Sequence, residues 1–188
     1  YQMDVVFRGE RAKDGRFRQF RQCDIDVVGR GKLSLLYDAQ IPAIIAEIFE
    51  AIKIGDFLIR INNRKVLTGF FASVGVLVEN IVSCIRIVDT VEKVGEVKVK
   101  KALKEIGLSE DQVEKVWDFT NIKGTVDDVL DKLKSMTKTV ENSEVLSQGI
   151  YELETVISGV RNLGVSDQRF CIDLSIARGL DYYTGTVY

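Results

Sequence analysis

The chain has 188 residues, of which 46% are hydrophobic and 29% charged, and its formal net charge at pH 7 is -2. This length allows one domain or two small ones with a real core, and the near-zero net charge argues against a protein that coats nucleic acid electrostatically. The absence of histidine excludes a Ser-His or Cys-His nucleophile. Because the three cysteines are also widely spaced, a zinc site is disfavoured. Any chemistry must therefore use carboxylates, arginines, tyrosines or a bound metal.

The first predicted elements are two strands over residues 1–8 and 16–28, joined by a loop at ERAKDG. The stretch FRGERAKDGRFRQFRQCDID, residues 7–26, carries an excess of positive charge. Because alternate side chains of a strand share one face, one face of the second strand is expected to present Arg16, Arg18, Phe20, Gln22, Asp24 and Asp26. A ligand with phosphates, a flat base and a small polar group would satisfy this face, because the arginine fork suits phosphate oxygens. A solvent-facing strand with arginine–carboxylate pairs is the alternative, and the spacing leaves both open.

The next predicted elements are a helix over residues 38–53, a strand over 55–63 and a short helix over 64–75. Isoleucines at helical spacing fall on one face of the first helix, which is expected to begin near Asp38 or Ala39. The only proline, Pro42, lies in its first turns, where a missing N–H does least harm. The alternation in GDFLIRINN favours a strand.

From about residue 76 the sequence becomes rich in lysine and glutamate with helical periodicity, and residues 76–163 are predicted to form a helical insertion. Ser109 and Thr125 are each followed by acidic residues and are expected to start helices. The charged face of this module is either solvated or contacts a partner. Residues 168–188 return to strand character on either side of a glycine-bearing turn. The order of sheet, helical insert and sheet predicts an α+β fold with one interrupted antiparallel sheet.

Both ends of the chain resemble one family. FRGERAKDGRFRQFRQCDID resembles motif 2 of class II aminoacyl-tRNA synthetases in the form carried by histidyl-tRNA synthetases, and ARGLDYYTGTVY resembles the histidine-specific signature of that family. IGDFLIRINNRKVLTGFF, residues 54–71, resembles the eukaryotic-type branch in particular. The resemblance implies an α+β catalytic domain, an antiparallel sheet flanked by helices with an inserted helical domain. Residues 1–75 and 164–188 would belong to the catalytic core and 76–163 to the insertion.

The resemblance also implies an activity, that of a histidine–tRNA ligase. Such an enzyme joins L-histidine to ATP, with Mg²⁺, as histidyl-adenylate, and then transfers the histidyl group to tRNA(His). A cytoplasmic homodimer without a membrane segment is expected. By motif position, the ATP-binding residues are Arg8 on the α-phosphate, Glu10 near the adenine edge, Arg16 on the γ-phosphate, Phe20 stacked on adenine, and Arg178 on the α-phosphate.

The residues implied to bind histidine overlap with those for ATP. Arg8 and Arg178 match the two arginines that also stabilise the reacting groups, so both are the expected catalytic residues. An acidic side chain can accept a hydrogen bond from a ring N–H, and Asp26 matches the family's reader of the imidazole. The full set by motif position is Arg8, Gln22, Asp26, Arg178, Tyr182 and Tyr183.

Parts of the family pattern are not in this sequence: motif 1, motif 3 and an anticodon-binding domain. The chain is therefore expected to be part of a longer enzyme and to be inactive alone. One alternative is the synthetase-like, histidine-sensing regulatory subunit of ATP phosphoribosyltransferase, which need not keep arginines aimed at ATP phosphates. Another alternative is a synthetase-like interaction module without catalysis.

Overall fold

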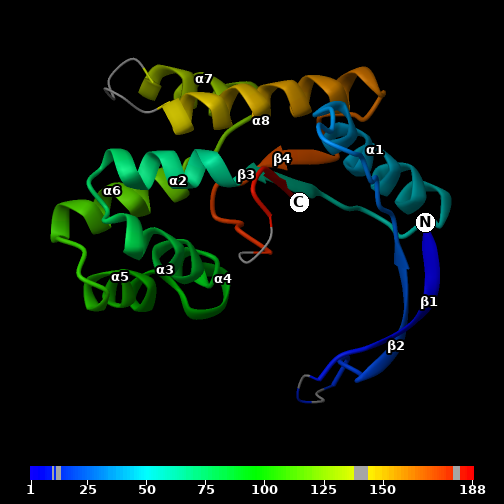
Figure 1. The fold of residues 1–188 in the computed structure, drawn as a ribbon, viewed down its shortest axis with the longest axis horizontal. Helices are drawn as coiled ribbons and strands as arrows, with labels where there is room; N and C mark the ends of the chain where they lie inside the picture. The colour runs from blue at the N-terminus through cyan, green and yellow to red at the C-terminus, as the bar shows by residue number, and fades with distance from the viewer. Residues whose placement is uncertain (10, 12–13, 138–143, 180–182) are drawn as a thin grey trace.

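A computed structural model of the chain describes residues 1–9, 11, 14–137, 144–179 and 183–188 (Figure 1). The strands are β1 (Gln2–Phe7), β2 (Gln19–Asp24), β3 (Ile59–Asn63), β4 (Phe170–Ile172) and β5 (Thr186–Val187). The helices are α1 (Leu36–Ala51), α2 (Arg64–Ser73), α3 (Val78–Val88), α4 (Val91–Val94), α5 (Glu96–Glu105), α6 (Glu110–Thr120), α7 (Val126–Thr137) and α8 (Glu144–Asn162).

The strands form two sheets, and the predicted α+β class is confirmed. β1 and β2 pair antiparallel as a hairpin, which projects away from the helices in Figure 1. The second sheet has the order β4-β3-β5, in which β3 runs antiparallel to β5 and parallel to β4. A parallel pair needs a long crossover, and helices α2 to α8 lie between β3 and β4 along the chain. Strands from distant positions therefore meet in one sheet, as predicted. The prediction of a single antiparallel sheet is wrong for the described residues, because the hairpin forms its own sheet and the β3–β4 pair is parallel.

Several predicted boundaries differ from those in the structure. The strand predicted over 16–28 is formed only by Gln19–Asp24, and the strand predicted over 55–63 only by Ile59–Asn63. The helix predicted over 38–53 runs over Leu36–Ala51 and contains Pro42 as a buried residue. The shorter second strand has a consequence for the site, because the two-residue period does not extend regularly to residues 16 and 26.

The predicted helix starts at Ser109 and Thr125 are confirmed by their hydrogen bonds. The Ser109 side chain accepts from the backbone N–H of Gln112, whose side chain accepts from the N–H of Ser109, which is a capping box. Thr125 and Asp128 exchange hydrogen bonds in the same way at the start of α7. These contacts satisfy N–H groups that the first turn of a helix leaves without a partner.

Helix α8 packs closely on α1 and α2 because glycines lie at the contacts. A Cβ added at Gly149 would lie 2.6 Å from the backbone nitrogen of Val66 in α2, and one added at Gly69 would lie 2.4 Å from that of Leu146 in α8. At Gly159 an added Cβ would lie 2.6 Å from the Ala39 Cβ in α1. Because Gly69 on α2 and Gly149 on α8 have no side chain, the backbones of the two helices can come close together at this contact.

The apolar core continues from the three-stranded sheet into the helical module. Ile61 on β3, Phe71 on α2 and Leu153 on α8 are fully buried. The Phe70 ring stacks on the Phe119 ring of α6 with a centroid distance of 3.7 Å, which connects α2 to the module. Among the described residues, the helices are all too short or too polar to cross a membrane.

Candidate functional site

One face of the β1–β2 hairpin carries several of the predicted site residues. Val6 pairs with Phe20 and Asp4 with Gln22 in the antiparallel register, and the backbone N–H of Arg8 continues the pairing by donating to the Arg18 carbonyl at 2.8 Å. Opposite residues in such a ladder lie on the same side. Consequently Arg8 stands on the face that also carries Phe20, Gln22 and Asp24.

Arg8 is held by two neighbours on this face. Its Nη2 donates to the Gln22 side-chain oxygen at 2.9 Å, and its guanidinium carbon lies 5.1 Å from the centre of the Phe20 ring. The Gln22 amide nitrogen in turn donates to Asp24 Oδ1 at 2.5 Å. A guanidinium over an aromatic face is a cation–π contact. The chain of contacts fixes where the positive charge of Arg8 lies.

A pocket of about 350 Å³ opens beside Arg8 and is lined by Arg8, Gly15, Arg16, Phe17 and Phe20. Its volume lies within the usual range for small-molecule sites. Two guanidiniums and two aromatic rings suit a ligand that is both anionic and flat, such as a nucleotide.

The C-terminal segment provides the second group of predicted residues. Arg178 is exposed and follows a buried run, residues 173–177. Gly179 has φ +63, and the N–H of Tyr183 donates to its carbonyl at 2.9 Å. Tyr183 is 52% exposed and lines a pocket of about 310 Å³ together with Lys65 and Glu152.

Glu152 is the buried charge of this second pocket. It accepts from Lys65 Nζ at 2.5 Å, Gln148 Nε2 at 2.9 Å and Asn63 Nδ2 at 3.1 Å. Burial alone would raise the pKa of Glu152, but these three donors outweigh it and hold the pKa below its usual value. The carboxylate is thus kept ionised inside the fold.

The structure brings together part of the predicted site. Arg8, Arg16 and Phe20 line one pocket, and Gln22 binds Arg8. Asp26 is exposed beyond the end of β2, and Arg178 and Tyr183 belong to the C-terminal segment with its own pocket. Glu10 and Tyr182 lie outside the described residues. The roles given to these nine residues stay predictions.

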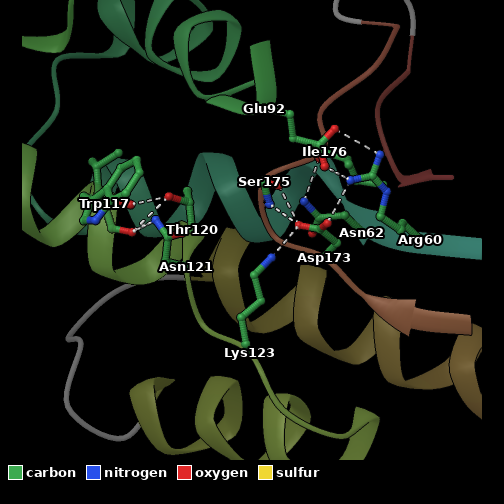
Figure 2. Close-up of polar contacts among 11 residues, drawn as sticks. Arg60, Asn62, Glu92, Trp117, Thr120, Asn121, Lys123, Asp173, Ser175 and Ile176 are labelled. Atoms are coloured by element: carbon green, nitrogen blue, oxygen red, sulfur yellow. Dashed lines mark hydrogen bonds and ion pairs between the residues drawn. The ribbon is translucent and has the colours of Figure 1, made fainter. Parts of the chain in front are cut away.

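Sequence reasoning missed a polar network around the buried Asp173, which precedes Arg178 in the chain (Figure 2). Asp173 Oδ1 accepts from the backbone N–H of Ser175 at 3.0 Å and from its hydroxyl at 2.6 Å. Arg60 and Lys123 lie 3.3 and 3.5 Å from the two carboxylate oxygens. Burial alone would raise the pKa of Asp173, but Ser175 and the two cations hold it below the usual range. The available signal was the polar residue inside the apolar run CIDL.

Comparison with known proteins places this geometry in a family. The profile of the family described as histidyl-tRNA synthetase matches residues 1–188. A histidine–tRNA ligase of Nostoc punctiforme is 72% identical over 188 residues, which are 100% of this chain and 40% of that protein. One from Clostridium tetani is 50% identical over 100% of this chain and 42% of that protein. The chain thus spans about two fifths of the length of these curated relatives.

Solved structures agree in fold. The crystal structure of histidyl-tRNA synthetase from Nostoc sp. PCC 7120 superposes with a TM-score of 0.93 at 67% identity, covering 99% of this chain and 42% of that one. An ATP phosphoribosyltransferase regulatory subunit/histidyl-tRNA synthetase from Bacillus halodurans C gives 0.76 at 15% identity, covering 98% of this chain and 45% of that one, which shows the fold alone.

The fold is that of a class II aminoacyl-tRNA synthetase. Within that class, the chain belongs to the histidyl-tRNA synthetase family. The predicted eukaryotic-type branch is not supported, because the relatives compared are cyanobacterial and other bacterial proteins. The stretch 54–71 that suggested it is largely core, with Ile61, Leu67 and Phe71 fully buried.

Proposed function

We propose that the protein carrying this chain is a histidine–tRNA ligase, which activates L-histidine with ATP and transfers it to tRNA(His). The observation that carries the proposal is the position of Arg8, which is held by Gln22 and Phe20 beside a pocket that it shares with Arg16. The 72% identity to a protein named histidine–tRNA ligase supports the same conclusion.

In the first step, an oxygen of the histidine carboxylate bonds to the α-phosphorus of ATP. The bond from that phosphorus to the oxygen leading to the β-phosphate breaks, and its electron pair leaves with pyrophosphate. The attacking carboxylate is already ionised, so the step needs no general base, which agrees with a chain that has no histidine. Arg8 and Arg178 stabilise the negative charge that grows on the pentavalent phosphorus.

The other predicted residues bind and orient the substrates. Arg16 contacts the γ-phosphate and Glu10 the adenine edge, while Phe20 stacks on the base. For histidine, Gln22 contacts the amino acid and Asp26 accepts from a ring N–H. Tyr182 and Tyr183 line the pocket for the imidazole ring. A site that pairs with both ring nitrogens rejects analogues that lack them, because its polar groups would be left without partners.

In the second step, a hydroxyl of the terminal ribose of tRNA(His) attacks the carbonyl carbon of the adenylate. The hydroxyl proton is lost and AMP leaves with the electrons of the broken bond. Mg²⁺, when bound, supplies charge neutralisation on the phosphates. Among the described residues, no group of three or more Asp, Glu, Cys or His side chains is arranged to hold a metal ion. The ion would therefore bind through phosphate oxygens and water.

The cytoplasmic location, the homodimer and the division into domains belong to the same proposal. The first two are what the resemblance to the histidyl-tRNA synthetase family implies. For the division into 1–75, 76–163 and 164–188, the packing of α3 and α6 on α5 supports a separate module, whereas α8 lies against α1 and α2 of the core.

The proposal is tested by histidine-dependent exchange of labelled pyrophosphate into ATP, on the protein as its gene encodes it. The wild type is expected to exchange. Arg8→Ala and Arg178→Ala are expected to lower kcat by about 10²–10³, the usual effect of removing one group that stabilises transition-state charge. Arg21→Ala is the matched control, because Arg21 lies in the same hairpin as Arg8 but on the opposite face. Its rate is expected to equal that of the wild type.

The other outcomes of the exchange assay would each indicate a different function. No exchange in the wild type contradicts the ligase. Histidine binding without exchange would instead indicate the regulatory-subunit function, and neither binding nor exchange would indicate an interaction module. A wild-type rate in Arg178→Ala would refute only the role given to that arginine.

A further inference from the structure

The peptide bond between Ile176 and Ala177, one residue before Arg178, is held from both sides by side chains. Its carbonyl oxygen accepts from Asn62 Nδ2 at 2.9 Å, and its N–H donates to Asp89 Oδ1 at 3.0 Å. The C=O and N–H of a trans peptide point in opposite directions, so these two hydrogen bonds together fix the orientation of the peptide plane.

Both side chains are themselves held in place. Asn62 is fully buried on β3, and its own Oδ1 accepts from the N–H of Asn63 at 2.8 Å, which turns the amide nitrogen toward Ile176. Asp89 follows directly after α3 and is partly buried. As a carboxylate it makes a charge-assisted bond to Ala177, which is stronger than one between neutral groups.

The residues on either side of this peptide are also fixed. Ile176 is 7% exposed and Ala177 fully buried. Upstream, Asp173 binds both the N–H and the hydroxyl of Ser175, and Arg60 joins Asp173 to Glu92 of α4 (Figure 2). The chain therefore reaches Arg178 in a set direction, although the Arg178 side chain itself is exposed.

We propose that Asn62 and Asp89 are positioning residues for Arg178. Asn62 belongs to the sheet and Asp89 to the predicted helical insertion, so the insertion takes part in aiming an arginine at the α-phosphate. This inference rests on the proposed function. Loss of the Asp89 bond frees the peptide plane, displaces Arg178 and slows adenylate formation, with little effect on the KM for histidine.

The test is a double-mutant cycle in the pyrophosphate exchange assay, on the protein as its gene encodes it. Asp89→Ala is expected to lower kcat about 10- to 100-fold, because a displacement near 1 Å can cost about 10²-fold. Asp89→Asn keeps an acceptor oxygen and is expected to stay within about threefold of the wild type. In the Arg178→Ala background, Asp89→Ala is expected to lower kcat by a further factor of less than about two. A residue that acts only through Arg178 has no effect once that side chain is removed.

Two controls separate positioning from a general loss of structure. Asp118→Ala removes an exposed carboxylate from the same module and is expected to leave kcat unchanged. If Asp89→Ala does not fold, Asp89→Glu takes its place, since it keeps the charge but moves the acceptor, and it is expected to lower kcat with the same non-additivity.

Independent, multiplying effects of the Asp89 and Arg178 substitutions would overturn the inference, as would a wild-type kcat in Asp89→Ala. Either result would leave the proposed function standing, provided that the wild type exchanges. Failure of the wild type to exchange would refute the proposed function instead.

Discussion

The substitution Gly149→Ala tests how closely helix α8 must pack on helix α2. Gly149 lies inside α8, where alanine is the better helix former by about 1 kcal/mol. The local effect of the substitution is therefore stabilising. The tertiary effect is the opposite, because the new Cβ would lie 2.6 Å from the Val66 nitrogen and 2.8 Å from the Lys65 carbonyl carbon.

The structure allows the size of the tertiary effect to be worked out. The new methyl group meets backbone atoms at the start of α2, which cannot rotate away as a side chain would. Reaching an ordinary contact distance requires α2 and α8 to separate by roughly 0.8 Å, and overpacking of this kind costs about 1–3 kcal/mol and sometimes more. Separation also strains the bonds from Lys65 and Asn63 to the buried Glu152. We expect a net loss of about 2 kcal/mol.

Native-state hydrogen exchange measures this loss at the helices themselves. A loss of about 2 kcal/mol corresponds to amide exchange about 30-fold faster in α2 and α8, where opening requires the helices to part. Ser147→Ala is the matched control, because Ser147 is exposed on the same helix and the change gains helix propensity without a new contact. Slower exchange in Gly149→Ala than in the wild type would show that propensity dominates and that the close α2–α8 contact is misjudged.

Two further predictions concern titration and thiol chemistry. The folded pKa of Asp173 lies below its unfolded value of about 3.9, so the stability that its carboxylate contributes is present above that value and is lost as pH falls through the folded pKa. In urea titrations, the unfolding free energy of Asp173→Asn is therefore expected to fall less steeply with decreasing pH than that of the wild type below about pH 4. Equal pH dependence of the two proteins would refute this. Burial raises the pKa of Cys84 to about 12, so a thiol reagent at pH 8 is expected to modify Cys84 only after unfolding, as followed by peptide mass spectrometry. Modification of folded Cys84 as fast as that of exposed Cys23 would contradict its burial.

The sequence predicted those features of the fold that depend on neighbouring residues. Ser109 gave the correct start of α6 because its cap is closed by Gln112, three residues on. The hairpin and the helix over Leu36–Ala51 follow from local alternation and helical spacing. The parallel pairing of Ile59 with Phe170 could not be read in this way, because it joins residues separated by the entire helical module.

The same distinction applies to the candidate site. Phe20 and Gln22 could be placed on one face from strand periodicity, and the structure puts them there with Arg8. Arg16 and Asp26 lie beyond the ends of β2, where periodicity carries no information. The hydrogen bond from Ala177 to Asp89 was equally invisible, because the sequence gives no sign that two residues from different segments will meet.

The two halves of the proposed site differ in how firmly the chain holds them. β1 and β2 pair with each other and most of their residues are exposed, so Arg8 depends on Gln22 and Phe20, its neighbours on the hairpin. The run before Arg178 is buried and bonded to both the sheet and the helical module. Catalysis by fixed charges requires groups that do not reorganise during the reaction. Under the proposed function, Arg178 therefore extends from the more firmly held segment, whereas Arg8 depends on contacts within the hairpin.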